Sequence, residues 1–283
     1  MYVVATPIGN LEDVTLRALR VLRDVRLIAA EDTRRTGRLL AHLGIDTPMS
    51  SLHAHNEHER VPRILDLLAA GHDVAMVTDA GTPLLSDPGT LVVRQVLDAG
   101  FRVEPVPGPS AITAALTMAG EGARGFSFEG FAPVKSNDRK GWMLRVLSSD
   151  HPVVFFEAPH RIARTLTELA ETAGPDRRVA LCREITKLHE ELIRGPIGQV
   201  AEHASVKDAQ GEFTVILLPG DTPATEAVSD EAVWQEFCDL TEREGLKRRE
   251  AVALLARRLG MSTRDAYAAV ERRKAERLAG LAP

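Results

Sequence analysis

Short apolar runs alternate with amphipathic stretches of helical length over the first hundred residues of the chain. This alternation is typical of βα units, which build a largely parallel sheet covered by helices. It predicts strands at residues 2–6, 26–30, 49–53, 73–78 and 102–106, and helices that begin near Asp13, Thr33, Glu57, Gly89 and Ser110. We therefore expect an N-terminal α/β domain over residues 1–119.

The pattern changes after Gly120. Strands are expected at residues 126–131, 153–157, 178–183, 188–194 and 212–218, with helices at 137–147 and 160–172. These elements predict a second α/β domain with a mixed sheet over residues 120–220. Pro, Thr, Ala and Asp are frequent in residues 221–229, a composition typical of a linker. Helices predicted at 230–244, 247–259 and 262–278 complete a C-terminal helical extension over residues 230–283.

The charge is distributed unevenly along the chain. The formal net charge is −5, but residues 245–283 hold ten Lys and Arg against four Asp and Glu, and 25 basic residues face 36 acidic ones before them. A second basic cluster contains Lys135, Arg139, Lys140 and Arg145. Two positive surfaces on an acidic protein predict a localised polyanionic partner. Solvated helix faces are the alternative interpretation of both clusters.

Several classes of protein are excluded by composition. No apolar run approaches the roughly 18 residues of a membrane helix, and residues 1–10 lack the basic start and long apolar stretch of a signal peptide. The expected location is therefore cytoplasmic, with no membrane or DNA partner. Cys182 and Cys238 are the two cysteines, which excludes a disulfide framework and a multi-cysteine zinc site.

The common nucleotide and nucleophile motifs give no function. Neither a P-loop nor a nucleophile elbow occurs in the sequence. Residues 120–125 fit the glycine pattern of dinucleotide binding, but they follow a predicted helix and precede a strand, the reverse of the required order. His53, His55 and His58 cluster in one segment, yet an extended chain does not direct all three to one face. We expect no metal site there, and a polar loop that faces a ligand is the favoured interpretation.

The segment 78–89 carries most information about function. It directly follows an apolar strand and combines glycines, prolines and aspartates. Gly81 lets the backbone approach a ligand closely, while prolines stiffen the loop. Asp79 and Asp87 add acceptors and negative charge, which suit a ligand with hydroxyls, an amine or a sulfonium better than a phosphate. A tight structural loop is the alternative.

Two further loops follow strands of the same predicted sheet. Residues 107–111, Pro-Gly-Pro-Ser-Ala, lead into a helix that Ser110 can cap. Residues 6–10, Thr-Pro-Ile-Gly-Asn, follow the first strand. The carboxyl ends of parallel strands meet at one edge of a sheet, where open α/β sheets bind their ligands. The three loops together predict a cleft at this edge.

The segments that carry these features stand in a recognisable order. They are residues 4–13, 30–34, 53–57, 79–89, 107–111, 128–131, 156–161 and 211–213. Together they resemble the motif set of the ribosomal RNA small subunit methyltransferase I family, a branch of the tetrapyrrole methylase-fold, or class III, methyltransferases. The resemblance covers about residues 1–220, and the basic helical extension resembles that of the family more loosely.

The resemblance implies a fold, a cofactor and a reaction. It implies a tetrapyrrole methylase-like fold, S-adenosylmethionine bound between two α/β domains of a homodimer, and 2′-O-methylation of a cytidine ribose in the decoding region of small-subunit (16S) rRNA. The cofactor-binding residues that it implies are Pro7, Asp79, Gly81, Thr82, Ser110, Ala111, Phe156 and Glu212. The segment after Phe131 carries a sparser lysine and arginine run than is usual in the family.

Methyl transfer to a hydroxyl requires alignment and a base that takes the proton. Glu31 and Asp32, at the end of the second strand, are the candidate bases, and Lys135 is a candidate to lower the pKa of the hydroxyl or to hold a phosphate. Glu31 and Asp32 can equally cap the helix that begins at Thr33. The predicted RNA phosphate contacts are Arg34, Arg35, Lys135, Arg139 and Lys140.

Two other functions fit the sequence less well. One is a small-molecule or protein methyltransferase of the same fold, acting on a tetrapyrrole or in diphthine synthesis. The basic clusters favour RNA over these acceptors. The other is an RNA-binding or ribosome assembly protein without catalysis, which would have no need for the loops of a cofactor pocket.

Overall fold

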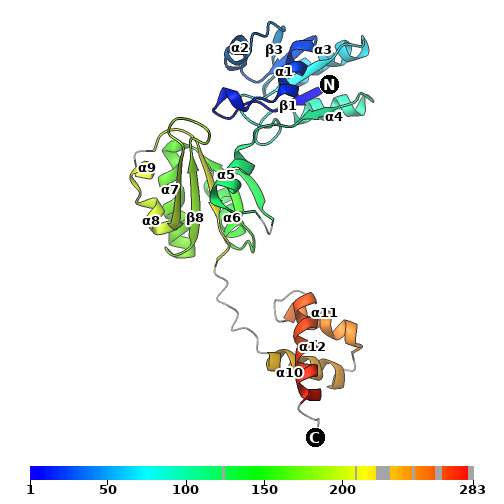
Figure 1. Ribbon diagram of the computed structural model, residues 1–283, viewed down its shortest axis with the longest axis vertical. Coiled ribbons are helices and arrows are strands. Elements are labelled where there is room, and N and C mark those ends of the chain that lie inside the picture. Colours follow the sequence, from blue (N-terminus) through cyan, green and yellow to red (C-terminus); the bar gives the residue numbers. More distant parts are fainter. Residues whose placement is uncertain (123–124, 208, 221–229, 244–245, 259–262, 280–283) are drawn as a thin grey trace. The chain divides into compact units, whose positions relative to one another are not determined.

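The computed structural model describes residues 1–122, 125–207, 209–220, 230–243, 246–258 and 263–279. The chain divides into two compact units, Met1–Gly220 and Asp221–Pro283 (Figure 1). Each unit has its own apolar core, and each is described separately below.

The first half of the Met1–Gly220 unit is built on a five-stranded parallel sheet of order β3-β2-β4-β1-β5. Its strands are β1 (Tyr2–Val4), β2 (Leu27–Ala30), β3 (Met49–Ser51), β4 (Val74–Val77) and β5 (Glu104–Val106). The helices between them are α1 (Leu16–Asp24), α2 (Thr33–His42), α3 (Glu57–Ala69) and α4 (Thr90–Asp98). The predicted alternation of strands and helices is confirmed. Buried side chains cover both faces of the sheet, as a parallel sheet requires.

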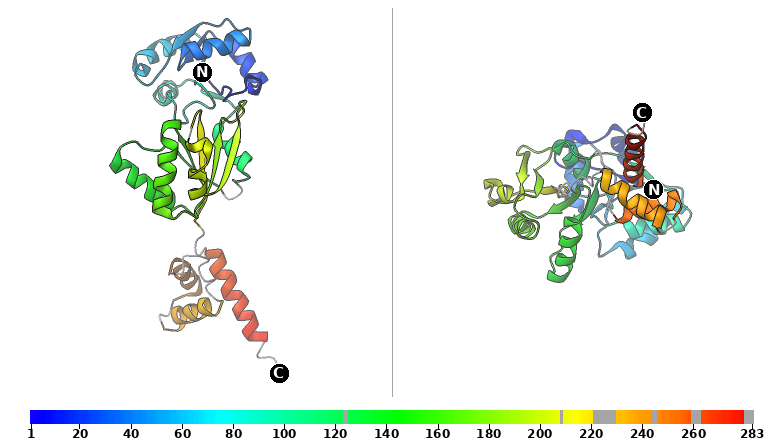
Figure 2. Two further views of the ribbon diagram at one scale, coloured as in Figure 1. Left: turned by 90° about the vertical axis from the view of Figure 1, so that its left-hand side faces the viewer. Right: turned by 90° about the horizontal axis from the view of Figure 1, so that it is seen from below.

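The second half is built on a mixed sheet of order β6-β7-β10-β8-β9, in which only the β6–β7 pair is parallel. Its strands are β6 (Ser127–Phe131), β7 (Val153–Glu157), β8 (Arg178–Arg183), β9 (Glu191–Pro196) and β10 (Phe213–Leu217). These strands, coloured green to yellow, lie side by side in Figure 2 (left). The predicted mixed sheet is confirmed.

Helices cover both faces of the second sheet. On one face α6 (Ser136–Leu147), α7 (Pro159–Ala173) and the short helices α8 (Ile197–Ala201) and α9 (Ala204–Lys207) border a core that contains Trp142, Phe155 and Phe213. The other face carries α5 (Ala111–Ala119), whose Ile112, Ala115 and Leu116 pack against Val154 and Ile216. The sequence placed α5 in the first domain by its position in the chain, whereas its apolar face packs on the second sheet (Figure 1).

Some boundaries differ from those predicted, for local reasons. The helix expected near Asp13 is a short 3₁₀ turn (Leu11–Asp13), and α1 begins only after Thr15, whose side chain accepts a hydrogen bond from the Ala18 amide at 3.1 Å. The strand expected from residue 188 begins at Glu191. Residues 184–190 form a turn instead, with left-handed φ angles of 49° at Glu184 and 66° at Thr186.

The Asp221–Pro283 unit contains three α-helices in its described residues. They are α10 (Asp230–Cys238), extended by a π-helical turn (Asp239–Arg243), α11 (Arg248–Arg258) and α12 (Thr263–Ala279). Val233, Leu240, Leu255, Ala266 and Val270 form their common core. The predicted linker at residues 221–229 lies outside the described residues. Among the described helices of the chain, none combines the length and apolar character that crossing a bilayer requires.

Candidate active site

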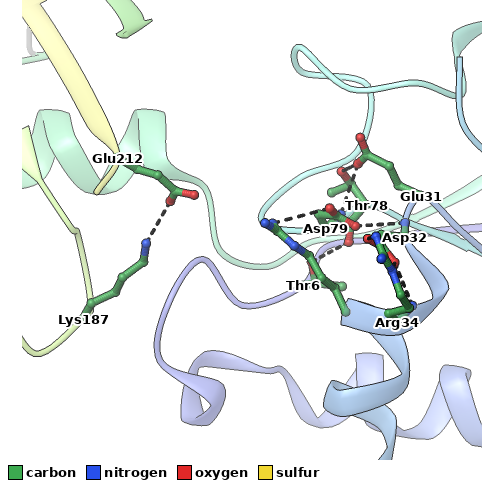
Figure 3. Close-up of polar contacts among 9 residues, drawn as sticks. Thr6, Glu31, Asp32, Arg34, Thr78, Asp79, Lys187 and Glu212 are labelled. Atoms are coloured by element: carbon green, nitrogen blue, oxygen red, sulfur yellow. Dashed lines mark hydrogen bonds and ion pairs between the residues drawn. The ribbon is translucent and has the colours of Figure 1, made fainter. Parts of the chain in front are cut away.

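Three loops at the carboxyl edge of the first sheet are joined by hydrogen bonds. The amides of Thr6 and Gly81 donate to each other's carbonyls at 2.9 and 3.0 Å, and the Thr6 hydroxyl donates to the Thr78 carbonyl at 3.2 Å (Figure 3). The Thr82 hydroxyl donates to the Pro109 carbonyl at 3.1 Å. The loops that follow β1, β4 and β5 therefore form one structure, as the predicted cleft requires.

Gly81 is required by this arrangement on two counts. Its φ angle is 83°, a conformation that is unfavourable for residues with a side chain. A Cβ atom at this position would lie 3.2 Å from Cγ2 of Ile8. The loop is thus closed tightly against the loop after β1, which leaves backbone rather than side chain at the cavity wall.

The second half reaches the same place through the turn before β9. The Asn10 amide donates to the Thr186 hydroxyl at 3.0 Å, and a Cβ atom on Gly9 would lie 2.5 Å from Cγ of Lys187. Nζ of Lys187 lies 2.8 Å from Oε1 of Glu184 and 3.0 Å from Oε2 of Glu212, so one cation joins the turn to the start of β10 (Figure 3). The two halves meet through these contacts.

A cavity of about 360 Å³ lies where the loops of both halves converge. From the first half it is lined by Ile8, Arg35, Asp79, Ala80, Gly81, Thr82, Leu85, Ser86 and Asp87. Ser110, Ala111 and Ile112 line it from the start of α5, and Phe131, Phe156, Glu157, Ala158, Pro159, Ile185, Glu212, Phe213 and Thr214 line it from the second half. The lining is apolar over most of its extent and carries several carboxylates.

The predicted cofactor-binding residues are gathered here with one exception. Asp79, Gly81, Thr82, Ser110, Ala111, Phe156 and Glu212 all line the cavity. Pro7 is buried and is not among the lining residues, while its neighbour Ile8 is. The hydroxyl of Ser110 makes no capping hydrogen bond to α5, although the residue stands at the N-cap position. The prediction that it caps this helix is wrong, and the hydroxyl remains available to the cavity.

Carboxyl groups cluster around Thr78 at the end of β4. The Thr78 hydroxyl donates to Oε2 of Glu31 at 2.7 Å, and the Asp79 amide donates to the same oxygen at 3.3 Å (Figure 3). Burial raises the pKa of Asp79, and the charge of Glu31 adds to this. Burial also raises the pKa of Asp87 to about 6, opposed by a hydrogen bond from Thr78. Because the Thr78 hydroxyl has one proton, it cannot donate to Glu31 and Asp87 at the same time.

Asp32 has a structural role that the sequence left open. Its side chain caps α2 by accepting from the Arg34 amide at 2.8 Å, and its Oδ2 pairs with Nη2 of Arg34 at 2.7 Å. The hydrogen bond from the Arg34 side chain, with that from the amide, holds the pKa of Asp32 well below its usual range. Such a carboxylate is a weak base. Glu31 does not cap α2, since its contacts are to Thr78 and Asp79.

The predicted phosphate contacts divide into four groups, and the fourth, Arg139, is described separately below. Arg34 is exposed and paired with Asp32, whereas Arg35 lines the cavity with Nη1 at 3.5 Å from Oδ2 of Asp79. Lys135 and Lys140 are exposed and form no ion pair within the described residues. Lys135 does not line the cavity. These two lysines keep the free charge that a phosphate contact needs.

Arg139 does not fit the predicted role. Its side chain is 8% exposed, and its Nε lies 2.6 Å from Oε2 of Glu168. Nη1 and Nη2 donate to the Pro133 carbonyl at 3.1 Å and the Thr165 hydroxyl at 2.8 Å. A guanidinium that is buried and saturated in this way cannot reach an RNA phosphate, so the prediction for Arg139 is wrong. Nothing in the sequence of a basic helix distinguishes an arginine that contacts RNA from one that is buried in an ion pair.

Thirteen of the residues that line the cavity were not among the predicted site residues, and three of them matter for the chemistry or for the walls of the cavity. Asp87, in the loop after β4, was named from the sequence as an acceptor for a ligand but not as a cofactor-binding or catalytic residue. Phe131 closes a segment that carries part of the resemblance. Ile185 lies in the left-handed turn before β9, which the sequence predicted only as part of a connection between strands.

Comparison with known proteins shows the family to which this chain belongs. The family of Tetrapyrrole (Corrin/Porphyrin) Methylases matches residues 1–201. The chain is 42% identical over 264 residues to the ribosomal RNA small subunit methyltransferase I of Pseudomonas aeruginosa, covering 92% of this chain and 93% of that protein. It is 46% identical over 218 residues to the protein of the same name from Thermotoga maritima, covering 77% and 97%.

Solved structures agree on the fold. A diphthine synthase matches with a TM-score of 0.62 at 13% identity, covering 77% of this chain and 88% of that one. A uroporphyrin-III-C-methyltransferase from Thermus thermophilus matches with a TM-score of 0.54 at 21% identity, covering 76% and 92%. The fold is that of the tetrapyrrole methylases, and the chain belongs to the ribosomal RNA small subunit methyltransferase I family.

Proposed function

We propose that this methyltransferase uses S-adenosylmethionine to methylate the 2′-hydroxyl of a cytidine in the decoding region of small-subunit (16S) rRNA, acting as a homodimer. The observation that supports this most is the cavity at the carboxyl edge of the first sheet, where close-packed glycine loops and several carboxylates converge. Membership of the family supplies the reaction class and the nucleic acid.

The residues of the cavity fit the proposed cofactor. S-adenosylmethionine, when bound, supplies a methyl group on a positively charged sulfur. Asp79, Asp87 and Glu212 place negative charge in a largely apolar wall, which suits such a cation. Phe156 offers an aromatic surface to the rest of the cofactor. The hydroxyl of Ser110, which does not cap α5, offers it a polar partner.

Asp87 is the carboxylate best suited to take the proton of the target hydroxyl. It lines the cavity, whereas Glu31 does not, and Asp32 is held ionised by Arg34. A base works best when its pKa lies near the working pH, and burial brings Asp87 toward it. As the ribose oxygen bonds to the methyl carbon, the carbon–sulfur bond breaks and the proton passes to Asp87. The Thr78 hydroxyl donates to Glu31 and is not needed by Asp87 once that carboxyl carries the proton.

The RNA is held outside the cavity by exposed cations. Lys135 and Lys140 lie after β6 and on α6, and Arg35 borders the cavity beside Asp79. Contacts of this kind position the RNA through its phosphates without reading the bases. Selection of one cytidine then depends on the shape of the subunit around it.

The test is transfer of labelled methyl from S-adenosylmethionine to small ribosomal subunits from cells that lack this protein, followed by mass spectrometry of the nucleosides. We expect a 2′-O-methylated cytidine that is lost in Asp79→Ala and retained in Asp98→Ala, a carboxylate at the end of α4 that does not line the cavity. No label in RNA, with cofactor binding intact, would favour a tetrapyrrole or protein acceptor. No increase in melting temperature with S-adenosylmethionine would favour a non-catalytic RNA-binding protein.

A further inference from the structure

We propose that Phe131 is a stacking platform for the nucleobase of the target nucleotide, which leaves its own stack to bring its ribose to the cavity. The inference rests on the proposed function, since it takes RNA as the substrate. An enzyme that acts on one nucleotide must often extrude it, and the lost stacking then needs a replacement.

Phe131 is placed where such a base would arrive. It lines the cavity, yet it is 53% exposed, unusual for a large aromatic side chain at a strand end. Its ring centroid lies 5.5 Å from that of Phe156, which also lines the cavity, at an interplanar angle of 59°. Phe131 thus has one partner on the protein side and presents the remainder of its ring to solvent.

The position of Phe131 is built by its surroundings and is not a frayed strand end. The pairing of β6 with β7 shifts register between Phe128 and Phe131, and bulges of this kind redirect side chains near active sites. Gly130 within the shift has a φ angle of 66°, and a Cβ atom there would lie 3.3 Å from Oγ of Ser86 in the loop after β4. The strand end is thereby fixed against the cavity loop.

Two arginines hold the residues that follow. Arg161 donates to the Ala132 carbonyl at 3.2 Å, and Arg139 donates to the Pro133 carbonyl at 3.1 Å. Both arginines are anchored by acids, Arg161 by the buried Glu157 at 2.5 Å and Arg139 by the partly exposed Glu168 at 2.6 Å. An aromatic ring that is held in place before binding loses little entropy when a base stacks on it.

The charged residues that follow Phe131 in the chain favour single-stranded RNA, and not a second copy of the chain, as the partner of its ring. Lys135 and Lys140 are exposed, form no ion pair within the described part of the chain, and follow Phe131 within nine residues. Exposed aromatic rings and free cations on one segment are the combination by which proteins bind unpaired nucleotides. A contact between two copies would instead place these like charges in an interface.

The experiment compares Phe131→Ala, Phe131→Leu and Phe131→Trp with the parent protein. We measure the KM for small ribosomal subunits in methyl transfer, the Kd for S-adenosylmethionine by calorimetry, and the Kd for end-labelled hexacytidylate by fluorescence anisotropy. Stacking on a base contributes about 1–3 kcal/mol, so Ala and Leu are expected to weaken both RNA measurements by roughly 5- to 150-fold. Trp restores them to within about threefold, and the cofactor affinity of all three variants changes far less than the RNA affinity of Ala and Leu.

Leu144→Ala is the matched control, because Leu144 is an apolar side chain on α6 that is 67% exposed and does not line the cavity. Three results would overturn the proposal: Leu performing as well as Phe, a loss of cofactor affinity in Phe131→Ala as large as its loss of RNA affinity, or a changed oligomeric state of that variant in sedimentation. If the parent methylates no RNA while hexacytidylate binding still ranks Trp and Phe above Leu and Ala, the proposed reaction is wrong and the platform stands. If the parent methylates subunits and all variants agree, the platform alone is wrong.

Discussion

The two sheets of the Met1–Gly220 unit contribute opposite electrostatic environments to one cavity. The parallel sheet ends in Glu31, Asp79 and Asp87, which share few donors, so burial and mutual repulsion raise the pKa of both aspartates. The mixed sheet ends in Glu157, whose fully buried side chain is paired with Arg161 and accepts from Thr165 at 2.6 Å. The parallel sheet therefore brings carboxyls with a raised pKa to the cavity, whereas the mixed sheet brings a carboxylate that is fully buried and paired.

The largest effect is expected from Asp87→Asn. Loss of a general base typically lowers the rate 10²- to 10⁴-fold, so we expect methyl transfer to fall by about 10³-fold at saturating S-adenosylmethionine. In the parent protein the rate should fall as the pH drops below about 6, since the carboxyl must be ionised to accept a proton. The pH profile of kcat checks this, and a profile without that limb would assign the proton to another group.

Asp32→Asn is the matched variant on the same sheet edge. Asn caps helices as well as Asp does, so the substitution removes the charge and keeps the cap on α2. We expect a far smaller loss of rate than in Asp87→Asn. Equal losses in the two variants would restore Asp32 as a candidate base and remove the contrast between it and Asp87.

Asp87→Asn also has a predicted effect on stability. The pKa of Asp87 is higher in the folded state than in the unfolded chain, so its contribution to stability is present below about pH 4 and is lost as the pH rises to about 6. The variant lacks this loss. We expect the melting temperature of the variant to rise relative to that of the parent between pH 4 and pH 8. If the difference between the two melting temperatures does not change with pH, burial does not raise the pKa of Asp87.

The next effect concerns the ion pairs between the helices that cover the mixed sheet. Arg139 and Arg164 bind the same acid, Glu168, but Arg139 is 8% exposed and Arg164 is 77% exposed. Arg139→Ala removes the donor to the Pro133 carbonyl and to the buried Thr165 hydroxyl, and a buried polar group left without its partner costs about 1–3 kcal/mol, so the free energy of unfolding should fall by at least about that amount. Arg164→Ala should lower it by about 0–1 kcal/mol. Denaturant unfolding measures both, and similar values would contradict the assigned burial of the Arg139 network.

A smaller effect is expected at two glycines of the first half that share a backbone conformation but differ in how closely other atoms approach them. Gly81 and Gly100 have φ angles of 83° and 82°, but a Cβ atom would meet Ile8 only at Gly81 and no atom within 4 Å at Gly100. Both Gly→Ala variants should lose about 1–2 kcal/mol of stability to backbone strain. Gly81→Ala should also weaken S-adenosylmethionine binding about 10-fold, or about 1.4 kcal/mol. Calorimetry that finds equal affinities in both variants would remove Gly81 from the cofactor site.

The smallest effect is expected on RNA binding, where a lysine without an ion pair is compared with an arginine that has one. Lys140 is unpaired within the described residues, while Arg34 is paired with Asp32. Lys140→Ala should weaken RNA binding a few-fold and reduce the slope of log K against log salt by about 1. Arg34→Ala should change the slope less, because its charge is already compensated. Binding titrations at several salt concentrations measure both slopes, and a larger change for Arg34 would move the RNA path to α2.

Prediction from sequence succeeded for features that depend on residues close together in the chain. The loops after β1, β4 and β5 were found because each strand is followed directly by glycine and proline, and parallel strands bring such loops to one edge. It failed for Arg139, because helix periodicity does not say which side of a short basic helix a neighbouring helix covers. It also failed to place α5, whose apolar face fits either sheet and packs on the second.

The sequence by itself determined the elements, the parallel and mixed sheets, and the edge at which the ligand loops lie, since these follow from hydrophobic period and from short-range backbone preferences. Only the tertiary structure decided which charges are satisfied. Asp32, Asp79 and Asp87 are the same chemical group, and one is a helix cap with a lowered pKa while the others have raised ones. The pKa of a carboxyl depends on burial and on neighbours far away in sequence, which only folding brings together.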